Sequence, residues 1–257
     1  EPRPLFRKER CISCGACVKA CPNGAVAPPD EGFETDFSAC SGAGDCADVC
    51  PSGARELCGK EMKVSDVMRE VLKERVFFEQ SGGGVTVSGG EPLSQPEFVT
   101  GFLMACKKEG LRTALDTSGF ASPSVLLSTA PFTDLYLYDV KIMNSGKHRQ
   151  YAGVDNEIIL SNLLKLSETG ARIWARTPVI PGVNSDETNL RETGEFLSLV
   201  RGVEQLNLLP YHSSAEDKHN RWRMDYTLSG THPPTEQSMR RAVEIIEDCG
   251  VKAIIGG

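Results

Sequence analysis

The sequence predicts an α/β protein whose main domain is built on a parallel sheet and follows a small cysteine-rich domain. Two observations carry this prediction. From residue 61 to residue 257, short apolar strands alternate with helical stretches, the pattern of repeated strand–helix units. Residues 1–60 instead hold eight of the 10 cysteines, are rich in glycine, proline and aspartate, and lack long apolar runs. A segment of that composition buries little apolar surface and needs cross-links such as bound metal.

Each expected element of the main domain has a local signal. Apolar residues recur at helical spacing over residues 63–80, and a short strand that ends in glycines follows at residues 84–89. Further strands are expected at residues 111–116, 134–141, 171–177, 203–209 and 251–255, and further helices at residues 96–108, 122–130, 145–167, 186–200 and 234–249. Polar residues close these strands, and functional residues collect at the carboxyl ends of parallel strands.

The overall charge and the apolar runs exclude several classes of protein. With 28 basic and 35 acidic residues, the formal net charge is −7, which argues against a surface that coats nucleic acid. No apolar run approaches the roughly 20 residues that span a bilayer, and no signal peptide opens the chain, so we expect no membrane partner. Without an export signal, the cysteines are expected in a reducing cytoplasm, as metal ligands and not as disulfides.

The first cysteine run has the spacing C-x2-C-x2-C-x3-C-P and comprises Cys11, Cys14, Cys17 and Cys21, followed by Pro22. This is the bacterial ferredoxin run, in which three thiolates hold one [4Fe–4S] cluster and the fourth belongs to a second cluster. A zinc site or free thiols are the alternatives, but a zinc site usually uses two separated pairs of cysteines. The spacing therefore favours an iron–sulfur cluster.

The second cysteine run keeps this spacing with one gap, because Ala43 stands where its second cysteine should be. By the ferredoxin pattern, one cluster takes Cys11, Cys14, Cys17 and Cys50, and the other takes Cys21, Cys40 and Cys46. We hypothesise that Cys58 replaces the missing ligand; a three-iron cluster, or no second cluster, would fit as well. The two remaining cysteines, Cys106 and Cys249, are expected to be buried small apolar residues.

The most informative stretch outside the cysteines is Ser-Gly-Gly-Gly-Val-Thr-Val-Ser-Gly-Gly-Glu-Pro-Leu, residues 81–93. Two glycines after a strand could form only a tight turn, but they also expose backbone groups that a ligand can approach closely. Taken with later strand-end motifs, this stretch resembles the glycyl radical enzyme activating enzymes of the radical S-adenosylmethionine (SAM) superfamily. Those motifs are Leu-Asp-Thr-Ser-Gly at 115–119, Asp-Val-Lys at 139–141, Thr-Pro-Val-Ile-Pro-Gly at 177–182 and Leu-Pro-Tyr-His at 209–212.

The resemblance runs in order over essentially the whole chain and implies a fold and a domain division. Residues 1–60 resemble the ferredoxin-like, two-cluster iron–sulfur insert that one subfamily carries. Residues 61–257 resemble a partial open (β/α)6 radical SAM barrel. This subfamily contains the activators of pyruvate formate-lyase-like, diol dehydratase-like and decarboxylase-type enzymes.

The resemblance also implies roles for residues at the strand ends. The motif that holds the amino group of SAM is matched by Gly89, Gly90 and Glu91. Positions around the SAM carboxylate, where a monovalent cation can bind, are matched by Asp116, Thr117 and Asp139. Three further SAM contacts are implied at Lys141, Arg176 and His212. These residue types suit the ligand, because a carboxylate pairs with cations and an ammonium pairs with oxygen atoms. His148, by contrast, is expected to be structural.

For the activity, the resemblance implies reductive cleavage of SAM to methionine and a 5′-deoxyadenosyl radical. The radical then takes a hydrogen atom from a glycine of a partner glycyl radical enzyme. The implied cofactors are SAM, one or two [4Fe–4S] clusters in the ferredoxin-like domain and a further radical SAM cluster. The ferredoxin-like clusters are expected to relay electrons from a flavodoxin or ferredoxin, in an anaerobic cytoplasm.

The C-x3-C-x2-C loop of the family, whose three thiolates bind the radical SAM cluster, is absent from residues 1–257. The first barrel strand is missing as well. Because the chain begins with Glu-Pro-Arg-Pro, where the ferredoxin-like insert of the family starts, we expect an N-terminally truncated activating enzyme without catalytic cysteines in this stretch. The alternative is an iron–sulfur electron-transfer or partner-binding protein without radical chemistry.

Overall fold

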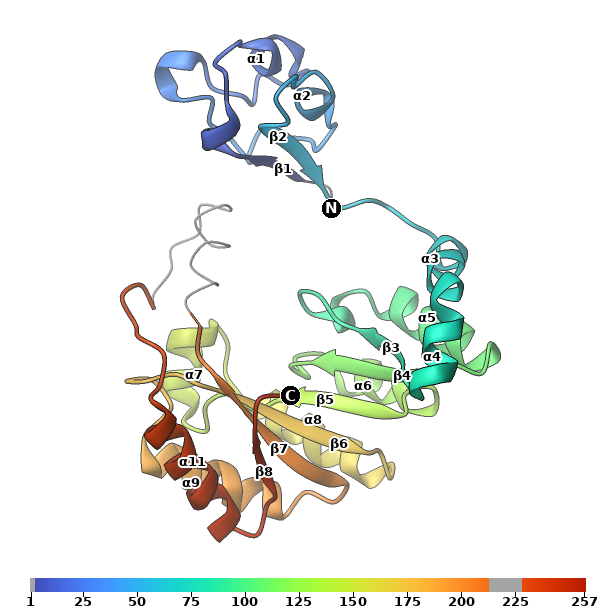
Figure 1. Cartoon of the computed structure of the whole chain (residues 1–257), viewed down its shortest axis with the longest axis vertical. Coiled ribbons are helices and arrows are strands. Elements are labelled where there is room, and N and C mark those ends of the chain that lie inside the picture. The colour runs from blue at the N-terminus through green and yellow to red at the C-terminus, as the bar shows by residue number, and fades with distance from the viewer. Residues whose placement is uncertain (1–2, 213–227) are drawn as a thin grey trace. The chain divides into compact units, whose positions relative to one another are not determined.

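The computed structural model describes residues 3–212 and 228–257, and the chain divides into two compact units (Figure 1). The first unit runs to Lys63, and the second begins at Val64. Within the described ranges, no helix is long and apolar enough to cross a membrane.

The first unit is small and is organised around its cysteines. Strand β1 (Arg3–Phe6) pairs antiparallel with β2 (Arg55–Cys58), so the beginning and the end of the unit lie side by side. The short helices between them are η1 (Lys8–Arg10), α1 (Ala16–Ala20), η2 (Pro29–Glu31) and α2 (Asp45–Asp48). The buried core consists of Cys17, Val26, Phe33 and Cys46. Two of the four core residues are cysteines, so the thiols lie at the centre of the unit.

The second unit is built on a parallel sheet with the order β3-β4-β5-β6-β7-β8 in the described part of the chain. Its strands are β3 (Gly84–Val87), β4 (Arg112–Thr117), β5 (Leu135–Asp139), β6 (Ile173–Val179), β7 (Val203–Pro210) and β8 (Ala253–Ile255). Each strand pairs with the strand that precedes it in the chain, and at least one helix connects the two (Figure 1). Such a sequential parallel order is that of a partly closed β/α barrel.

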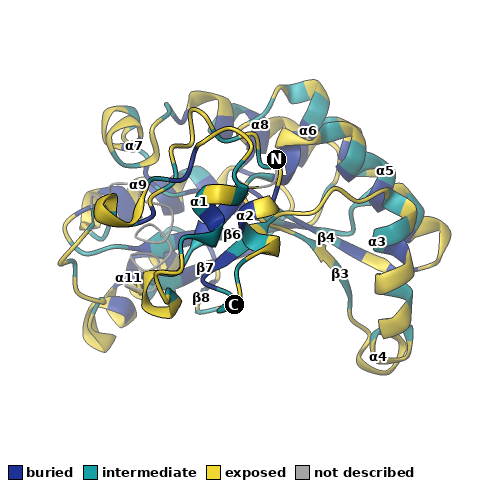
Figure 2. Cartoon of the chain, turned by 90° about the horizontal axis from the view of Figure 1, so that it is seen from above, coloured by how far each residue is buried: buried dark blue, intermediate teal, exposed yellow. Residues whose placement is uncertain are grey.

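Helices cover one face of this sheet. The connecting helices are η4 (Pro92–Ser94), α5 (Pro96–Lys108), α6 (Pro123–Thr129), η5 (Ala130–Phe132), α7 (Ser145–Ala152), α8 (Glu157–Glu168), α9 (Glu187–Ser198) and α11 (Glu236–Asp248). In β5, Tyr136 and Tyr138 are fully buried, whereas the alternate residues Leu135, Leu137 and Asp139 are only partly buried. Buried stretches lie in the strands of the sheet, whereas much of the helix surface is exposed (Figure 2). Because successive side chains of a strand point to opposite faces, one face packs against the helices and the other stays open. Polar groups on the open face can therefore reach a ligand.

Two of the expected helices are interrupted. Residues 63–80 form α3 (Val64–Val71), the 3-10 turn η3 (Leu72–Glu74) and α4 (Arg75–Ser81). Residues 145–167 form α7 and α8, because Gly153 adopts a φ of 79° and ends α7. This left-handed conformation is the usual end of a helix and favours glycine. Both ranges are helical as expected, but helical spacing alone does not reveal where such a stretch is interrupted.

The two cysteines of the second unit differ in burial. Cys106 in α5 is fully buried, and its Sγ lies 3.7 Å from Met68 Sδ, which confirms its expected apolar role. Cys249, which follows α11, is only partly buried, so the expectation of a buried residue was wrong for it. Burial raises the pKa of the Cys106 thiol to about 11.

Replacing Cys106 by alanine should lower the free energy of unfolding by about 1–2 kcal/mol at pH 7.5, through lost packing. A raised pKa in the folded state means that the neutral thiol contributes stability that is fully present below pH 9 and is lost as pH rises toward about 11. The difference between wild type and C106A should therefore shrink from pH 7.5 to pH 10. Urea unfolding at both pH values measures it, and an unchanged difference would contradict the buried thiol.

Candidate functional site

Three charged side chains meet near the carboxyl ends of neighbouring strands in the second unit. Asp116 lies near the end of β4 and Asp139 ends β5, and Arg176 of β6 lies directly beside Asp139 in the parallel register. All three belong to the partly buried set of alternate residues, so they face the side of the sheet that helices leave open. All three were predicted from the sequence as site residues, and the structure brings them together.

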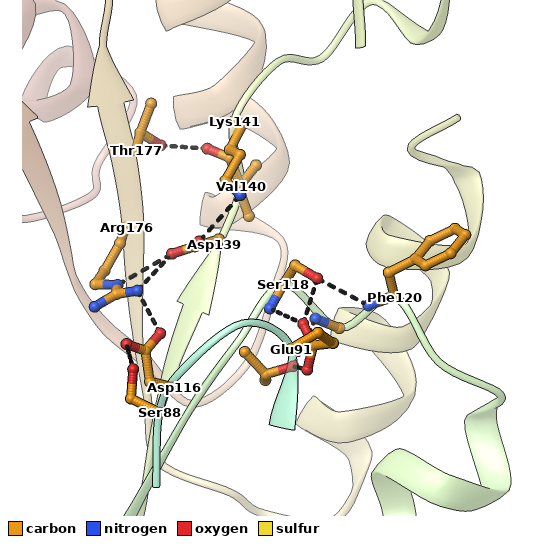
Figure 3. A network of polar contacts seen from close by, with 12 residues as sticks. Ser88, Glu91, Asp116, Ser118, Phe120, Asp139, Val140, Lys141, Arg176 and Thr177 are labelled. Atoms are coloured by element: carbon orange, nitrogen blue, oxygen red, sulfur yellow. Dashed lines mark hydrogen bonds and ion pairs between the residues drawn. The ribbon is translucent and has the colours of Figure 1, made fainter. Parts of the chain in front are cut away.

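The guanidinium of Arg176 bridges the two carboxylates (Figure 3). Its Nε and Nη2 lie 3.1 and 2.8 Å from Asp139 Oδ1, and Nη2 also donates to Asp116 Oδ1. Lys141 Nζ lies 3.3 Å from Asp139 Oδ2, and Ser88 Oγ donates to Asp116 Oδ2 at 2.8 Å. The bridging side chains are only 18–20% exposed, so this array of two cations and two anions is partly shielded from solvent.

Glu91 ties the loop after β3 to the end of β4. Its Oε1 accepts hydrogen bonds from Thr117 Oγ1 at 2.6 Å and from Leu93 N at 3.1 Å. Its Oε2 accepts two more from Ser118, at 2.9 Å from the backbone N and 2.5 Å from Oγ. The carboxylate of Glu91 and the hydroxyl of Thr117 are therefore engaged inside the protein. Ser118 was not among the predicted site residues, although it directly follows Asp116-Thr117 in the strand-end motif.

The loop that Glu91 anchors is open at its two glycines. Gly89 has a φ of 135°, a conformation that L side chains rarely adopt, so the backbone itself requires glycine there. A Cβ atom built at Gly89 or Gly90 would meet no atom within 4 Å. The backbone of these two residues is therefore accessible to a ligand.

A cavity of about 200 Å³ adjoins this network. It is lined by Glu91, Ser118, Phe120, Asp139, Lys141, His148, Ala152, Val154 and Ile159. His148, expected to be structural, is buried at this wall, and its Nδ1 lies 2.7 Å from Val154 O. His212 follows β7, is exposed and does not line the cavity, so the structure leaves it apart from the other site residues. Phe120 and His148 carry no distinguishing sequence pattern, and only folding brings them to the strand ends.

In the first unit, one small cavity is lined by all four cysteines that the sequence assigns to the first cluster: Cys11, Cys14, Cys17 and Cys50. Backbone N–H groups point at two of the sulfur atoms. Ser13 N lies 3.4 Å from Cys11 Sγ, and Arg55 N lies 3.4 Å from Cys50 Sγ. Hydrogen bonds to sulfur tune and stabilise clusters held by thiolates, so these residues suit a [4Fe–4S] cluster.

A second cavity is lined by the three cysteines of the other set, together with Ala43: Cys21, Cys40 and Cys46. Cys58 does not line this cavity and instead pairs with Arg3 in the β1–β2 ladder. Two other residues of β2 lie on the side of the two cavities. Arg55 lines the first cavity, and Leu57 Cδ2 lies 3.1 Å from a Cβ built at Gly44, which lines the second. Side chains alternate along a strand, so Cys58 points to the opposite face. The structure therefore does not bring Cys58 to the second site, contrary to the hypothesis.

Arg55 is a buried cation that lines the cavity of the first cysteine set and acts by its charge on Cys46 of the second set. It is 2% exposed, its Nη1 donates to Thr35 Oγ1 at 2.8 Å, and its Nη2 donates to Phe33 O. Its Cζ lies 4.8 Å from the centroid of the Phe6 ring. Burial raises the pKa of Cys46, and the charge of Arg55 opposes that rise. The Arg55 Nε is buried and has no hydrogen-bond partner in the described part of the chain, which fits a donor directed at an anionic cluster.

Replacing Arg55 by methionine should lower the reduction potential of the first cluster by about 40 mV, or roughly 1 kcal/mol, because a buried positive charge favours the reduced cluster. Arg55→Lys should keep most of the potential, since it keeps the charge. Arg10→Met, which removes an exposed arginine of the same unit, is the control. A redox titration followed by electron paramagnetic resonance measures the potentials, and equal potentials in R55M and R10M would contradict the prediction.

Comparisons with known proteins identify two family models in this chain. The radical SAM superfamily matches residues 48–193, and the 4Fe-4S dicluster domain matches residues 10–54. The trans-4-hydroxy-L-proline dehydratase activating enzyme of Clostridioides difficile is 38% identical over 256 residues, which cover 98% of this chain and 84% of that protein. The choline trimethylamine-lyase activating enzyme of Oleidesulfovibrio alaskensis is 37% identical over 92% of this chain and 78% of its own length.

Among solved structures, a domain of a pyruvate-formate lyase-activating enzyme from Bacteroides vulgatus superposes with a TM-score of 0.59 at 36% identity. The match covers 68% of this chain and 99% of that domain. The predicted fold class, a radical SAM α/β domain with an iron–sulfur domain ahead of it, is thereby confirmed. The chain belongs to the radical SAM superfamily and, within it, to the activating enzymes of glycyl radical enzymes.

Proposed function

We propose that this protein cleaves SAM reductively and installs a glycyl radical on a partner enzyme of the pyruvate formate-lyase-like family. The observation that carries the proposal is the Asp116–Arg176–Asp139–Lys141 array beside the open Gly89–Gly90 loop, at the strand ends of a radical SAM fold. The relatives are named as activators of a dehydratase and of a lyase, which supports a glycyl radical enzyme as the protein substrate.

The residues of the array suit the amino acid part of SAM. Lys141, whose side chain is 40% exposed, and Arg176 supply positive charge for the SAM carboxylate. The aspartates hold these two cations in place. Because the Glu91 carboxylate is engaged with Thr117 and Ser118, the accessible backbone oxygens of the glycine loop are left to accept from the SAM ammonium. Glu91 and Thr117 thus act by positioning the loop.

Two further site predictions carry over to this proposal. We propose that His212, which is exposed and follows β7, contacts SAM at the rim of its site. A monovalent cation near Asp116 and Asp139 remains a prediction, and Arg176 already bridges these carboxylates in the structure.

The two units have different roles in this proposal. In our proposal, residues 1–60 hold the ferredoxin-like clusters and pass electrons from a flavodoxin or ferredoxin, and residues 61–257 bind SAM. When bound, a reduced radical SAM cluster supplies the electron that splits SAM and so starts hydrogen abstraction from glycine. The chain's own part is to orient SAM through Lys141 and Arg176 at the strand ends. Because the cysteines are assigned as cluster ligands and not as disulfides, we expect the protein to work in a reducing, anaerobic cytoplasm.

The test is anaerobic incubation with SAM and dithionite, of the protein together with any residues that its gene encodes ahead of Glu1. Methionine and 5′-deoxyadenosine should form, and a candidate partner from the same gene neighbourhood should acquire the doublet signal of a glycyl radical. Without SAM cleavage, the protein would instead be an electron-transfer or partner-binding protein without radical chemistry. SAM cleavage without a glycyl radical would support the proposed SAM chemistry and contradict only the choice of partner enzyme.

A further inference from the structure

The second cysteine cavity of the first unit offers three thiols where a [4Fe–4S] cluster has four iron atoms. Cys21, Cys40 and Cys46 line this cavity, and Ala43 lines it at the position where the ferredoxin spacing calls for a cysteine. A methyl group cannot ligate iron. The wall that would hold the fourth thiolate therefore carries no ligand from this position.

No other cysteine in the described part of the first unit lines this cavity. The remaining thiols of the first run, with Cys50, line the other cavity. Cys58 lies on the face of the β1–β2 sheet that also carries Glu56, and Glu56 pairs there with Arg7 and Arg10. A turn of Cys58 toward the second cavity would require a one-residue shift in register, which would also turn Arg55 and Leu57 away from the cysteines.

The side chains that do line the second cavity beside these thiols offer only oxygen and nitrogen. Asp45, at the first position of α2, is exposed and provides the one carboxylate, and Ser41 and Asn23 provide a hydroxyl and an amide. Iron of a sulfide cluster is held less firmly by such hard donors, or by water, than by thiolate. The corner of the cluster that faces Ala43 is consequently its weak point.

We propose that the second cluster is held by three cysteines and that the iron facing Ala43 is exchangeable. One-electron oxidation then gives [4Fe–4S]²⁺ → [3Fe–4S]⁺ + Fe²⁺ + e⁻, in which the cluster loses one electron to an oxidant such as ferricyanide and one ferrous ion to solvent. Ferrous ion with a one-electron reductant reverses the step. The second site is thus a binding site for a divalent transition-metal ion, set by Cys21, Cys40 and Cys46. This inference rests on the dicluster domain and not on SAM chemistry.

The experiment compares wild type, Ala43→Cys and Cys58→Ser, each reconstituted anaerobically with iron and sulfide and then treated with ferricyanide. Wild type and C58S should release about one ferrous ion per chain to a colorimetric chelator and show the electron paramagnetic resonance signal of an oxidised three-iron cluster. A43C completes the thiolate set and should lose most of the signal and of the released iron. The comparison with A43C assigns the signal to this cluster and not to any other cluster with an open iron.

Cys46→Ala provides a second check, because it removes a ligand of the second site alone. It should lower the iron content by about three to four atoms per chain and abolish the signal, which covers the case in which the new thiol of A43C fails to ligate. Wild type that keeps all of its iron under ferricyanide, a C58S variant that loses the second cluster, or wild type that holds one cluster only would each overturn the proposal. All of these readouts are independent of SAM cleavage. A failure of the proposal on the second cluster can therefore be distinguished from a failure of the proposed function.

Discussion

Replacement of Arg176 by methionine is expected to reduce SAM cleavage at least about 100-fold, or roughly 2.7 kcal/mol. The variant leaves Asp116 and Asp139 facing one another without the guanidinium that bridges them, in a site that is 18–20% exposed. It also removes a positive charge from the proposed position of the SAM carboxylate. Hydrogen bonds to charged groups contribute about 1.5–3 kcal/mol each, so the loss of a bridge and of a ligand contact accounts for the size of the effect.

The measurements are the rate of 5′-deoxyadenosine formation and the affinity for SAM. Arg172→Met is the matched control, because Arg172 lies just before β6, is exposed and pairs with Glu204 away from the site. Arg176→Lys should recover part of the activity, since it can still pair with one carboxylate. An R176M variant whose SAM affinity and rate stay within about threefold of R172M would show that the array does not bind SAM.

Replacement of Gly119 by alanine is expected to destabilise the second unit by about 3–5 kcal/mol. Gly119 has a φ of 71°, and a Cβ built on it would lie 1.7 Å from Tyr138 Oη. Tyr138 is fully buried and donates from Oη to Ile159 O at 2.7 Å, and Asn162 Nδ2 donates to Gly119 O at 2.8 Å. Burial first, and the charge of Glu91 second, raise the pKa of Tyr138, so this hydroxyl remains a donor. Neither the ring nor the loop can move without breaking these bonds.

Gly153→Ala separates the clash from the backbone conformation. Gly153 has a similar φ of 79°, but a Cβ there would meet no atom within 4 Å, so G153A should lose only about 1 kcal/mol. Anaerobic urea unfolding, followed by far-ultraviolet circular dichroism, compares the two variants. G119A should also displace Ser118 and thereby loosen the anchor of Glu91, so SAM affinity should fall with stability. Equal destabilisation of the two variants would mean that Tyr138 does not confine this loop.

The order of the elements could be predicted because local patterns encode it. Each expected strand of the second unit coincides with an observed one to within a few residues, since buried parallel strands are short apolar runs bounded by turn residues. The sequence did not predict the beginning of α4, which follows a 3-10 turn, or the end of α7, which lies at a left-handed glycine. Such features change one or two dihedral angles without changing the apolar pattern.

The charged residues of the site could be selected for a similar reason. A parallel sheet places all its carboxyl strand ends at one edge, so Asp116, Asp139 and Arg176 were expected there before their contacts were known. What those side chains bind within the protein could not be predicted. Glu91 matches the motif that holds the SAM amino group, but its hydrogen bonds to Thr117 and Ser118 could not be foreseen. Likewise, no sequence pattern indicated that His148 of α7 would line the cavity.

The sequence by itself determined the parallel α/β order and the division of the cysteines into a set of four and a set of three, because both follow from the order and spacing of residues along the chain. It also carried the resemblance to the family, because the strand-end motifs are short runs of specific residues. Only the tertiary structure decided which face of β2 carries Cys58, how Arg55 lies buried against both sets, and which carboxylates share Arg176. These depend on side-chain direction and on contacts between segments 37 to 60 residues apart, as in the Arg176 network. The order of residues along the chain does not reveal side-chain direction or contacts between distant segments, because both arise only when strands pair and helices pack.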